Sequence, residues 1–138
     1  MWEVETTDTF DKWFNHQTQA LKEDVLAIMH ILSEYGPQLG RPWVDTVKNS
    51  HYANMKELRI QHAGDPVRAF FAFDPVRKAI ILCAGNKTGK NEKRFYKDMI
   101  TMADAEFSDY LASKGGRMAT LKELMAQQSQ GKSGANCR

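Results

Sequence analysis

Cysteine is scarce in this chain of 138 residues, which holds Cys83 and Cys137. One falls in a predicted strand and the other in the tail, so we expect no disulfide framework. The four histidines lack the spacing of metal ligands, and we expect no metal site. The segment Gly85–Asn91 misses the P-loop pattern, because three residues separate its glycines and asparagine follows the lysine. We therefore predict no nucleotide hydrolysis and no small-molecule cofactor.

Long apolar runs are also missing, and none approaches the roughly 20 residues that a membrane span requires. Residues 1–5 lack the basic and then apolar pattern of a signal peptide. Hydrophobic residues make up 42% of the chain and charged residues 26%, a balance typical of soluble globular proteins. We expect one core, a reducing cytoplasmic location and no membrane partner.

Charge is present but unevenly distributed. Residues 1–40 carry two lysines against seven acids, a net of −5, and residues 98–138 carry five charges of each sign. Residues 41–97 carry twelve Lys/Arg against five acids, a net of +7. The overall net charge of +2 thus hides a strongly basic middle segment, which indicates a polyanionic partner.

Two helices are predicted before the basic segment. The first follows an N-cap at Thr7 or Asp8 and turns an aromatic face inward, made of Phe10, Trp13 and Phe14. The second spans about 20–35, where apolar residues recur at helical spacing. It ends at Gly36-Pro37, because glycine accepts a left-handed cap and proline cannot continue the helix. We expect residues 37–54 to form an ordered loop.

Three strands are predicted next, at 55–61, 67–73 and 78–84, joined by turns at 64–66 and 74–77 into an antiparallel meander. The last is apolar on both faces, as in a central strand. A third helix is expected from about 92 to 111, with a buried stripe of Phe95, Met99, Met102 and Phe107. The predicted class is α+β, with two N-terminal helices packed on a small twisted antiparallel sheet and a C-terminal helix after the last strand. Residues 1–112 form the domain, and residues 113–138, with Gly115-Gly116, form a flexible or weakly helical extension.

The strand pattern places cations on one face of the sheet. If the helices cover the face with Leu58 and Ile60, Arg59 and Arg68 project from the other, with lysines near its rim: Lys56, Lys87 and Lys90. Converging cations can hold phosphates by charge and by bidentate hydrogen bonds. The alternative is a solvated face with a Glu57–Arg59 or Asp65–Arg68 surface pair, and the pattern alone leaves both open.

Two further side chains near this face can carry proton chemistry. His62 ends the first long strand and is either a general base or a turn residue at the surface. Tyr96 lies one turn into the last helix, beside the basic loop. Its phenol is either functional or packs on the sheet edge.

The order of these features resembles the RelE/ParE toxin superfamily, and within it the phage-derived HigB-like branch of type II toxin–antitoxin systems. The resemblance covers about residues 1–112. It is carried mainly by Met55-Lys-Glu-Leu-Arg59, Val67-Arg-Ala-Phe-Phe-Ala-Phe73-Asp and Ile80-Ile-Leu-Cys-Ala-Gly-Asn-Lys87. It implies a small α+β domain whose exposed sheet face is the working surface.

This resemblance implies a ribosome-dependent mRNA endoribonuclease that inhibits translation. The RNA 2′-OH would attack the adjacent phosphate and leave a 2′,3′-cyclic phosphate. The partners implied are the ribosome, mRNA and a cognate helix-turn-helix antitoxin. The resemblance assigns catalytic roles to Arg59, Arg68, Lys87 and Tyr96, and the two arginines are expected to stabilise the phosphate. RNA-binding roles pass to Lys56, Lys90, Lys93 and Arg94.

Other functions fit the same fold. A ParE-like protein would inhibit DNA gyrase without being an enzyme, and the basic residues favour RNA without excluding that alternative. A third is an inactive binding module held in an antitoxin complex. The general base and acid stay open among lysine, Tyr96 and His62. The tail segment 118–125 resembles the opening of a separate small protein, or forms an extension that masks the basic face.

Overall fold

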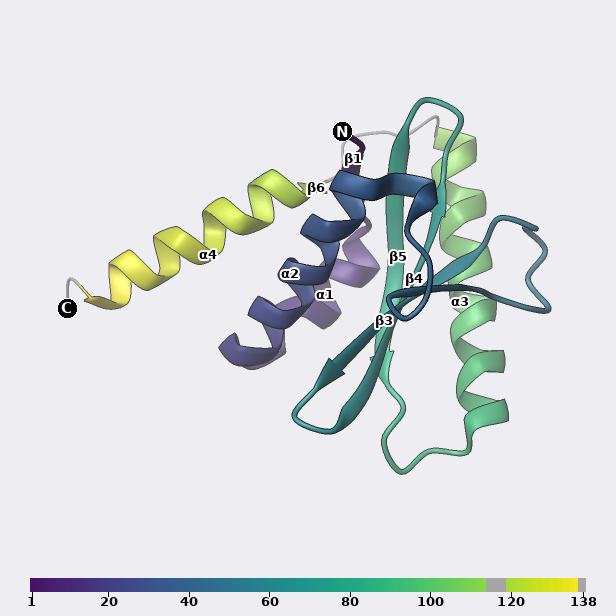
Figure 1. The fold of residues 1–138 in the computed structure, drawn as a ribbon, viewed down its shortest axis with the longest axis horizontal. Helices are drawn as coiled ribbons and strands as arrows, with labels where there is room; N and C mark the ends of the chain where they lie inside the picture. Colours follow the sequence, from purple (N-terminus) through teal and green to yellow (C-terminus); the bar gives the residue numbers. More distant parts are fainter. Residues whose placement is uncertain (114–118, 137–138) are drawn as a thin grey trace.

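The computed structural model describes residues 1–113 and 119–136 of the chain. The elements in order are β1 (Glu3–Thr6), α1 (Asp8–Asn15), α2 (Gln19–Tyr35), the 3-10 turn η1 (Gly36–Gln38), β2 (Val44–Thr46), β3 (Lys56–His62), β4 (Asp65–Phe73), β5 (Lys78–Asn86), α3 (Glu92–Ser113), β6 (Ala119–Thr120) and α4 (Leu121–Asn136). Within the described ranges the strands form one sheet in the order β2-β3-β4-β5-β1-β6. Helices α1 and α2 cover one face of this sheet, and α3 covers the other (Figure 1).

Short polar contacts fix the ends of the N-terminal helices. The Thr7 hydroxyl accepts the N–H of Phe10 at 3.1 Å and caps α1, as the sequence predicted. Helix α2 ends at Gly36, whose φ of 58° lies in the left-handed region. A Cβ atom at this glycine would lie 2.4 Å from the Trp2 indole, so the close approach of that ring also requires glycine.

The central meander β3–β4–β5 is antiparallel, as predicted. Its register places Arg59 directly opposite Arg68, and Glu57 opposite Phe70. The prediction of a purely antiparallel sheet is corrected by β1, which pairs with β5 in parallel. The sheet is therefore mixed. The cause is the chain path, because α1, α2 and the three strands β2, β3 and β4 intervene between β1 and β5, so that these two strands can run in the same direction.

The predicted open face of the sheet is covered by α3, which corrects the expectation of an exposed working surface. Beneath α3 lies an apolar core built from Phe70, Ala72, Ile80, Leu82, Cys83, Phe95, Met99, Ile100, Ala103, Phe107 and Tyr110. Phe70 and Leu82 point away from α1 and α2, so the sheet needs a second apolar layer to cover them. Met102, predicted in the buried stripe, is 43% exposed, and Ile100 and Ala103 are buried instead.

The segment 37–54, predicted as a loop, contains the short edge strand β2. Its last part is held against α3 by side chains. Asp104 accepts hydrogen bonds from the Ser50 hydroxyl at 2.5 Å and from the His51 N–H at 3.0 Å. The hydroxyls of Tyr52 and Ser108 also lie 2.5 Å apart. These contacts make the loop a fixed wall beside α3.

The C-terminal segment joins the sheet. Strand β6 pairs with β1, and Leu121 and Leu124 at the start of α4 are buried in the core under α1 and α2. From there α4 extends away from the sheet (Figure 1). The boundary after residue 112 stays a prediction, and Gly115-Gly116 and Cys137 lie outside the described residues. No helix among the described residues is long and apolar enough to cross a membrane.

Candidate functional site

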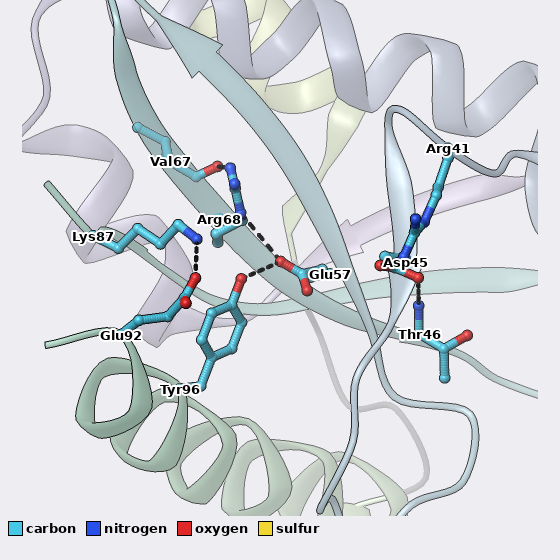
Figure 2. Close-up of polar contacts among 9 residues, drawn as sticks. All are labelled: Arg41, Asp45, Thr46, Glu57, Val67, Arg68, Lys87, Glu92 and Tyr96. Atoms are coloured by element: carbon cyan, nitrogen blue, oxygen red, sulfur yellow. Dashed lines mark hydrogen bonds and ion pairs between the residues drawn. The ribbon is translucent and has the colours of Figure 1, made fainter.

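Arg68 lies beneath α3 and is only 5% exposed. Its Nη1 donates to the Val67 carbonyl at 3.0 Å, and its Nε lies 3.2 Å from Glu57 Oε1 (Figure 2). The Nε–H is not aimed at that oxygen and finds no hydrogen-bond partner within the described part of the chain. A buried donor without a hydrogen-bond partner is costly, and this N–H is available to an acceptor that enters the site.

Glu57 connects Arg68 to α3. It is buried on β3, and its Oε1 accepts the Tyr96 hydroxyl at 2.6 Å (Figure 2). Burial and this hydrogen bond to the carboxylate raise the pKa of Tyr96 to about 12. The phenol is therefore a neutral donor near neutral pH. The sequence analysis missed Glu57 as a functional candidate, although its position diagonal to Arg68 follows once the strand register is known.

Lys87 extends the cluster toward the basic loop. Its Nζ lies 2.7 Å from Glu92 and 5.3 Å from the centre of the Tyr96 ring. The hydrogen bond from Lys87, followed by its charge, lowers the pKa of the Glu92 carboxyl. Three of the four predicted catalytic residues, Arg68, Lys87 and Tyr96, thus form one contiguous group with Glu57.

Arg59, the fourth predicted catalytic residue, faces Arg68 across the β3–β4 ladder and is half-buried. Its charge helps to lower the pKa of Asp45, a shift caused first by the hydrogen bond from Arg41. It also contributes to the lowered pKa of Glu92, whose main cause is Lys87 described above. The charge of Arg59 therefore acts on two carboxylates, Asp45 and Glu92, which are both labelled in Figure 2.

A groove of about 830 Å³ opens beside the cluster. Glu57 and Tyr96 line it, and the 46–51 segment and α3 form its walls. Three lysines contribute to the lining, Lys48, Lys93 and Lys97, against the two acids Glu57 and Asp104. The groove therefore presents a mostly cationic wall next to a hydrogen-bonded carboxylate.

The four predicted RNA-binding residues divide among separate places. Lys93 lines the groove, but Lys90 and Arg94 line a second cleft on another side of α3. Lys56 donates to the Thr46 hydroxyl at 3.3 Å, at the β2–β3 edge of the sheet. The structure thus does not gather these cations into one patch.

His62 lies apart from the cluster. Its Nδ1 is 2.5 Å from Asp24 Oδ2, so it joins the end of β3 to α2. The described residues contain no group of three or more potential metal ligands.

The site can carry out proton transfer and hold an anion. Glu57 is a carboxylate acceptor between a phenol and a guanidinium, and it can take a proton from a hydroxyl that reaches the groove. Arg68, Arg59 and Lys87 supply positive charge around it, where a buried setting strengthens their effect on a developing anion. Such a combination suits attack of a hydroxyl on a phosphate.

Comparison with solved structures shows the fold. The free state of a double arginine-to-alanine mutant of the Escherichia coli toxin RelE aligns with a TM-score of 0.53 and 8% sequence identity. The alignment covers 72% of this chain and 94% of RelE. The fold is therefore that of the RelE class of toxins.

Sequence comparison identifies the family. Residues 12–108 match the family described as Phage derived protein Gp49-like (DUF891). Two proteins of Mycobacterium tuberculosis (strain ATCC 25618 / H37Rv), which carry the names toxin HigB2 and toxin HigB3, are 46% identical over 101 residues and 43% identical over 106 residues. The alignments cover 72% and 77% of this chain, half the length of HigB2 and 90% of HigB3. The chain belongs to the phage-derived Gp49-like family, as a RelE-like toxin of the type II toxin–antitoxin class related to HigB.

Proposed function

We propose that this toxin is an endoribonuclease that cuts mRNA on the ribosome and so stops translation in the cytoplasm. The observation that carries the proposal is the Arg68–Glu57–Tyr96 cluster, with Glu57 and Tyr96 at the wall of a lysine-lined groove. The family implies an antitoxin partner, and we propose that this partner is a helix-turn-helix protein that keeps the toxin inactive.

In the proposed reaction the groove holds the RNA backbone with its lysines. Glu57 takes the proton of the 2′-OH as that oxygen attacks the adjacent phosphorus. Arg68 and Arg59 neutralise the extra negative charge on the phosphate oxygens, and the Arg68 Nε–H donates to one of them. The bond from phosphorus to the 5′-oxygen breaks, and that oxygen takes a proton from Lys87. The products are a 2′,3′-cyclic phosphate and a 5′-hydroxyl.

Tyr96 has a positioning role in this scheme. Its hydroxyl donates to Glu57, and its raised pKa of about 12 keeps the phenol protonated near neutral pH, so that almost no phenolate is present to accept a proton. Its hydrogen bond fixes the direction of the carboxylate, which leaves the other oxygen of Glu57 for the 2′-OH. This assignment changes the predicted catalytic role of Tyr96 from a reacting phenol to a group that orients the base.

The test is mRNA cleavage in a translating extract, with the cut sites mapped by primer extension. Glu57→Gln and Arg68→Ala should each lower the cleavage rate by about 100-fold or more, since a positioned base contributes on that order. The matched control is Glu34→Gln, an exposed carboxylate on α2 that pairs with His30. Equal cleavage by wild type and Glu57→Gln would remove Glu57 from the mechanism. Absence of cleavage by wild type, together with inhibition of gyrase supercoiling, would replace the proposal with the ParE-like function.

A further inference from the structure

A second cleft, of about 650 Å³, lies beside the first turns of α3. It is bounded by α1, the end of β5 and the start of α3, and its lining includes Trp13, Gly85, Lys90, Arg94, Phe95 and Asp98. We call it the Trp13 cleft. Neither the Arg68–Glu57–Tyr96 cluster nor the proposed reaction uses any of these residues.

Trp13 gives the cleft a rigid aromatic wall. The residue is half-buried on α1, and its ring packs against Phe10 with the ring centres 5.8 Å apart at an interplanar angle of 43°. The floor is apolar and close-packed, because a Cβ atom at Gly85 would lie 3.1 Å from the Phe95 ring. A fixed indole over an apolar floor is a surface on which a flat ring can stack.

The polar rim of the cleft favours an anion. Lys90 Nζ lies 5.7 Å from the centre of the Phe95 ring, and the Arg94 side chain is 83% exposed. Asp98 is the one acid among the described residues that line the cleft, and its Oδ2 lies 4.0 Å from Arg94 Nε. Two cations beside an aromatic wall match a nucleotide, which combines a phosphate with a flat base.

Helix α3 separates the Trp13 cleft from the groove. Lys93 and Lys97 line the groove, whereas Arg94 and Asp98 line the Trp13 cleft, so the two sites lie on adjoining sides of the helix. An α-helix with its side chains is about 10–12 Å across, a distance that a few nucleotides of extended strand can cover. One single strand that crosses the start of α3 can therefore contact both sites.

We propose that the Trp13 cleft binds an unstacked base of the same single-stranded RNA whose backbone lies in the groove. Lys90 and Arg94 hold the phosphates next to that base. The RNA identity of the ligand rests on the proposed function, but base binding in the cleft is separable from cleavage. The cleft adds a base contact to a site that otherwise grips only backbone, and it can bias which RNA segments the toxin holds.

The experiment measures binding of the full chain to a fluorescein-labelled 2′-O-methyl RNA of about twelve nucleotides, which cannot be cut by 2′-OH attack. An abasic oligonucleotide of the same length is the second probe. Trp13→Leu should weaken binding of the RNA by roughly tenfold and leave binding of the abasic probe unchanged. The control Trp2→Leu changes an indole that packs on Phe73 and Arg77, away from the cleft, and should bind both probes as wild type does.

Replacing the two cations of the cleft, Lys90 and Arg94, should change RNA binding in a different way from Trp13→Leu. Lys90→Gln/Arg94→Gln should weaken binding of both probes and reduce the slope of log K against log salt by about 1.4, because each lost phosphate contact removes about 0.7 for a single strand. If Trp13→Leu binds the RNA like wild type, or loses both probes equally, the base-binding proposal is wrong.

A measurement that keeps Trp13 intact guards against a folding defect in Trp13→Leu. The chain has three tryptophans, so Trp2→Phe/Trp43→Phe leaves Trp13 as the sole indole emitter. RNA should quench its fluorescence and the abasic probe should not; no quenching by RNA overturns the proposal. Cleavage in the translating extract is scored separately. If mRNA is cut but RNA does not quench Trp13, the base-binding proposal is rejected and the proposed nuclease activity stands. If RNA quenches Trp13 but mRNA is not cut, the nuclease activity is rejected and base binding in the cleft stands.

Discussion

The two faces of the sheet solve the same packing problem with different residues. The face under α1 and α2 buries apolar side chains and a few hydroxyls, such as that of Ser33. The face under α3 buries an apolar core as well, but together with charged groups that include Glu57, Arg68 and Asp104. Buried ion pairs are weak contributors to stability, because apolar replacements are often as stable or more so. The contrast teaches that the α1/α2 face is held mainly by apolar packing, whereas the α3 face also buries charged groups, among them the Glu57–Arg68 pair of the proposed site.

The largest effect on stability should come from the α1/α2 face. Phe71 is fully buried there, between β4 and the two helices. Phe71→Ala should lower the free energy of unfolding by about 3–5 kcal/mol, since it leaves a cavity in a packed core. Urea unfolding followed by circular dichroism measures the change. A loss below 1 kcal/mol would contradict the view that this face is the main source of stability.

Replacing the buried ion pair should separate stability from activity. Glu57→Leu/Arg68→Met removes both charges together, and we expect a free energy of unfolding unchanged or higher by about 1–4 kcal/mol. The same variant should not cut mRNA. Glu57→Leu alone should be destabilised by about 3–5 kcal/mol, because it leaves Arg68 buried without a counter-charge. If the double variant is as unstable as Glu57→Leu alone, the ion pair stabilises the fold. The proposed difference between the two faces of the sheet would then be wrong.

Tyr96→Phe should have a smaller and pH-dependent effect. It removes a hydrogen bond to a carboxylate, worth about 1.5–3 kcal/mol, and leaves the rings of Phe70 and Phe95 in contact with position 96. The pKa of Tyr96 is raised from 10.0 to about 12, so the folded state holds the phenol proton more tightly than the unfolded state. The stability from this group is therefore full below about pH 10 and is lost as pH rises through 12. Urea unfolding at several pH values should show that the free energy of unfolding falls less at alkaline pH for Tyr96→Phe than for wild type. An equal fall in both proteins would exclude Tyr96 as the titrating group.

The smallest effect should be at the edge of the α3 face, where Lys87 pairs with the exposed carboxylate of Glu92. Lys87→Met removes the charge and the hydrogen bond that hold the pKa of Glu92 below its usual value. The pKa of Glu92 should rise toward that value in an NMR titration, with no measurable change in the urea midpoint, because the Glu92 carboxylate is exposed and water and salt screen its pairing with Lys87. Lys97→Met, which changes a groove lysine outside the Lys87–Glu92 ion pair, is the matched control. A large loss of stability in Lys87→Met would place this lysine in the core of the cluster instead of at its rim.

Much of the fold followed from sequence patterns, because they report local preferences. Alternation gave the three-stranded meander, and Gly36-Pro37 marked the end of α2. The strand β2 was missed, since three residues carry too little alternation to be recognised. Parallel pairing of β1 with β5 depends on contacts between distant segments, which no local pattern encodes. The cover provided by α3 was predictable in principle, because the central strand was apolar on both faces and needed a layer on each.

The structure places three of the predicted catalytic residues near one another, but their arrangement differs from the one that the sequence predicted. Arg68, Lys87 and Tyr96 came together as a group, but Arg68 is buried and not displayed on an open surface. Glu57 was paired with the wrong partner, because a diagonal contact across two strands requires the hairpin register. The direction in which Arg94 points depends on the rotation of α3, which is set by the packing of Phe95 and Met99. Catalytic roles for these residues stay predictions.

The two ends of the sheet bear on how this toxin associates with other chains. One edge is β2, a strand of three residues, and the other is β6, a strand of two residues contributed by the C-terminal segment. Long bare edges invite identical molecules to join their sheets into aggregates, and short edge strands offer little template for this. Two copies of the toxin therefore have only these short edge strands in the described sheet through which their sheets could pair. A protein that captured the toxin by adding a strand beside β1 would first have to displace β6, which makes the C-terminal segment a competitor for that edge.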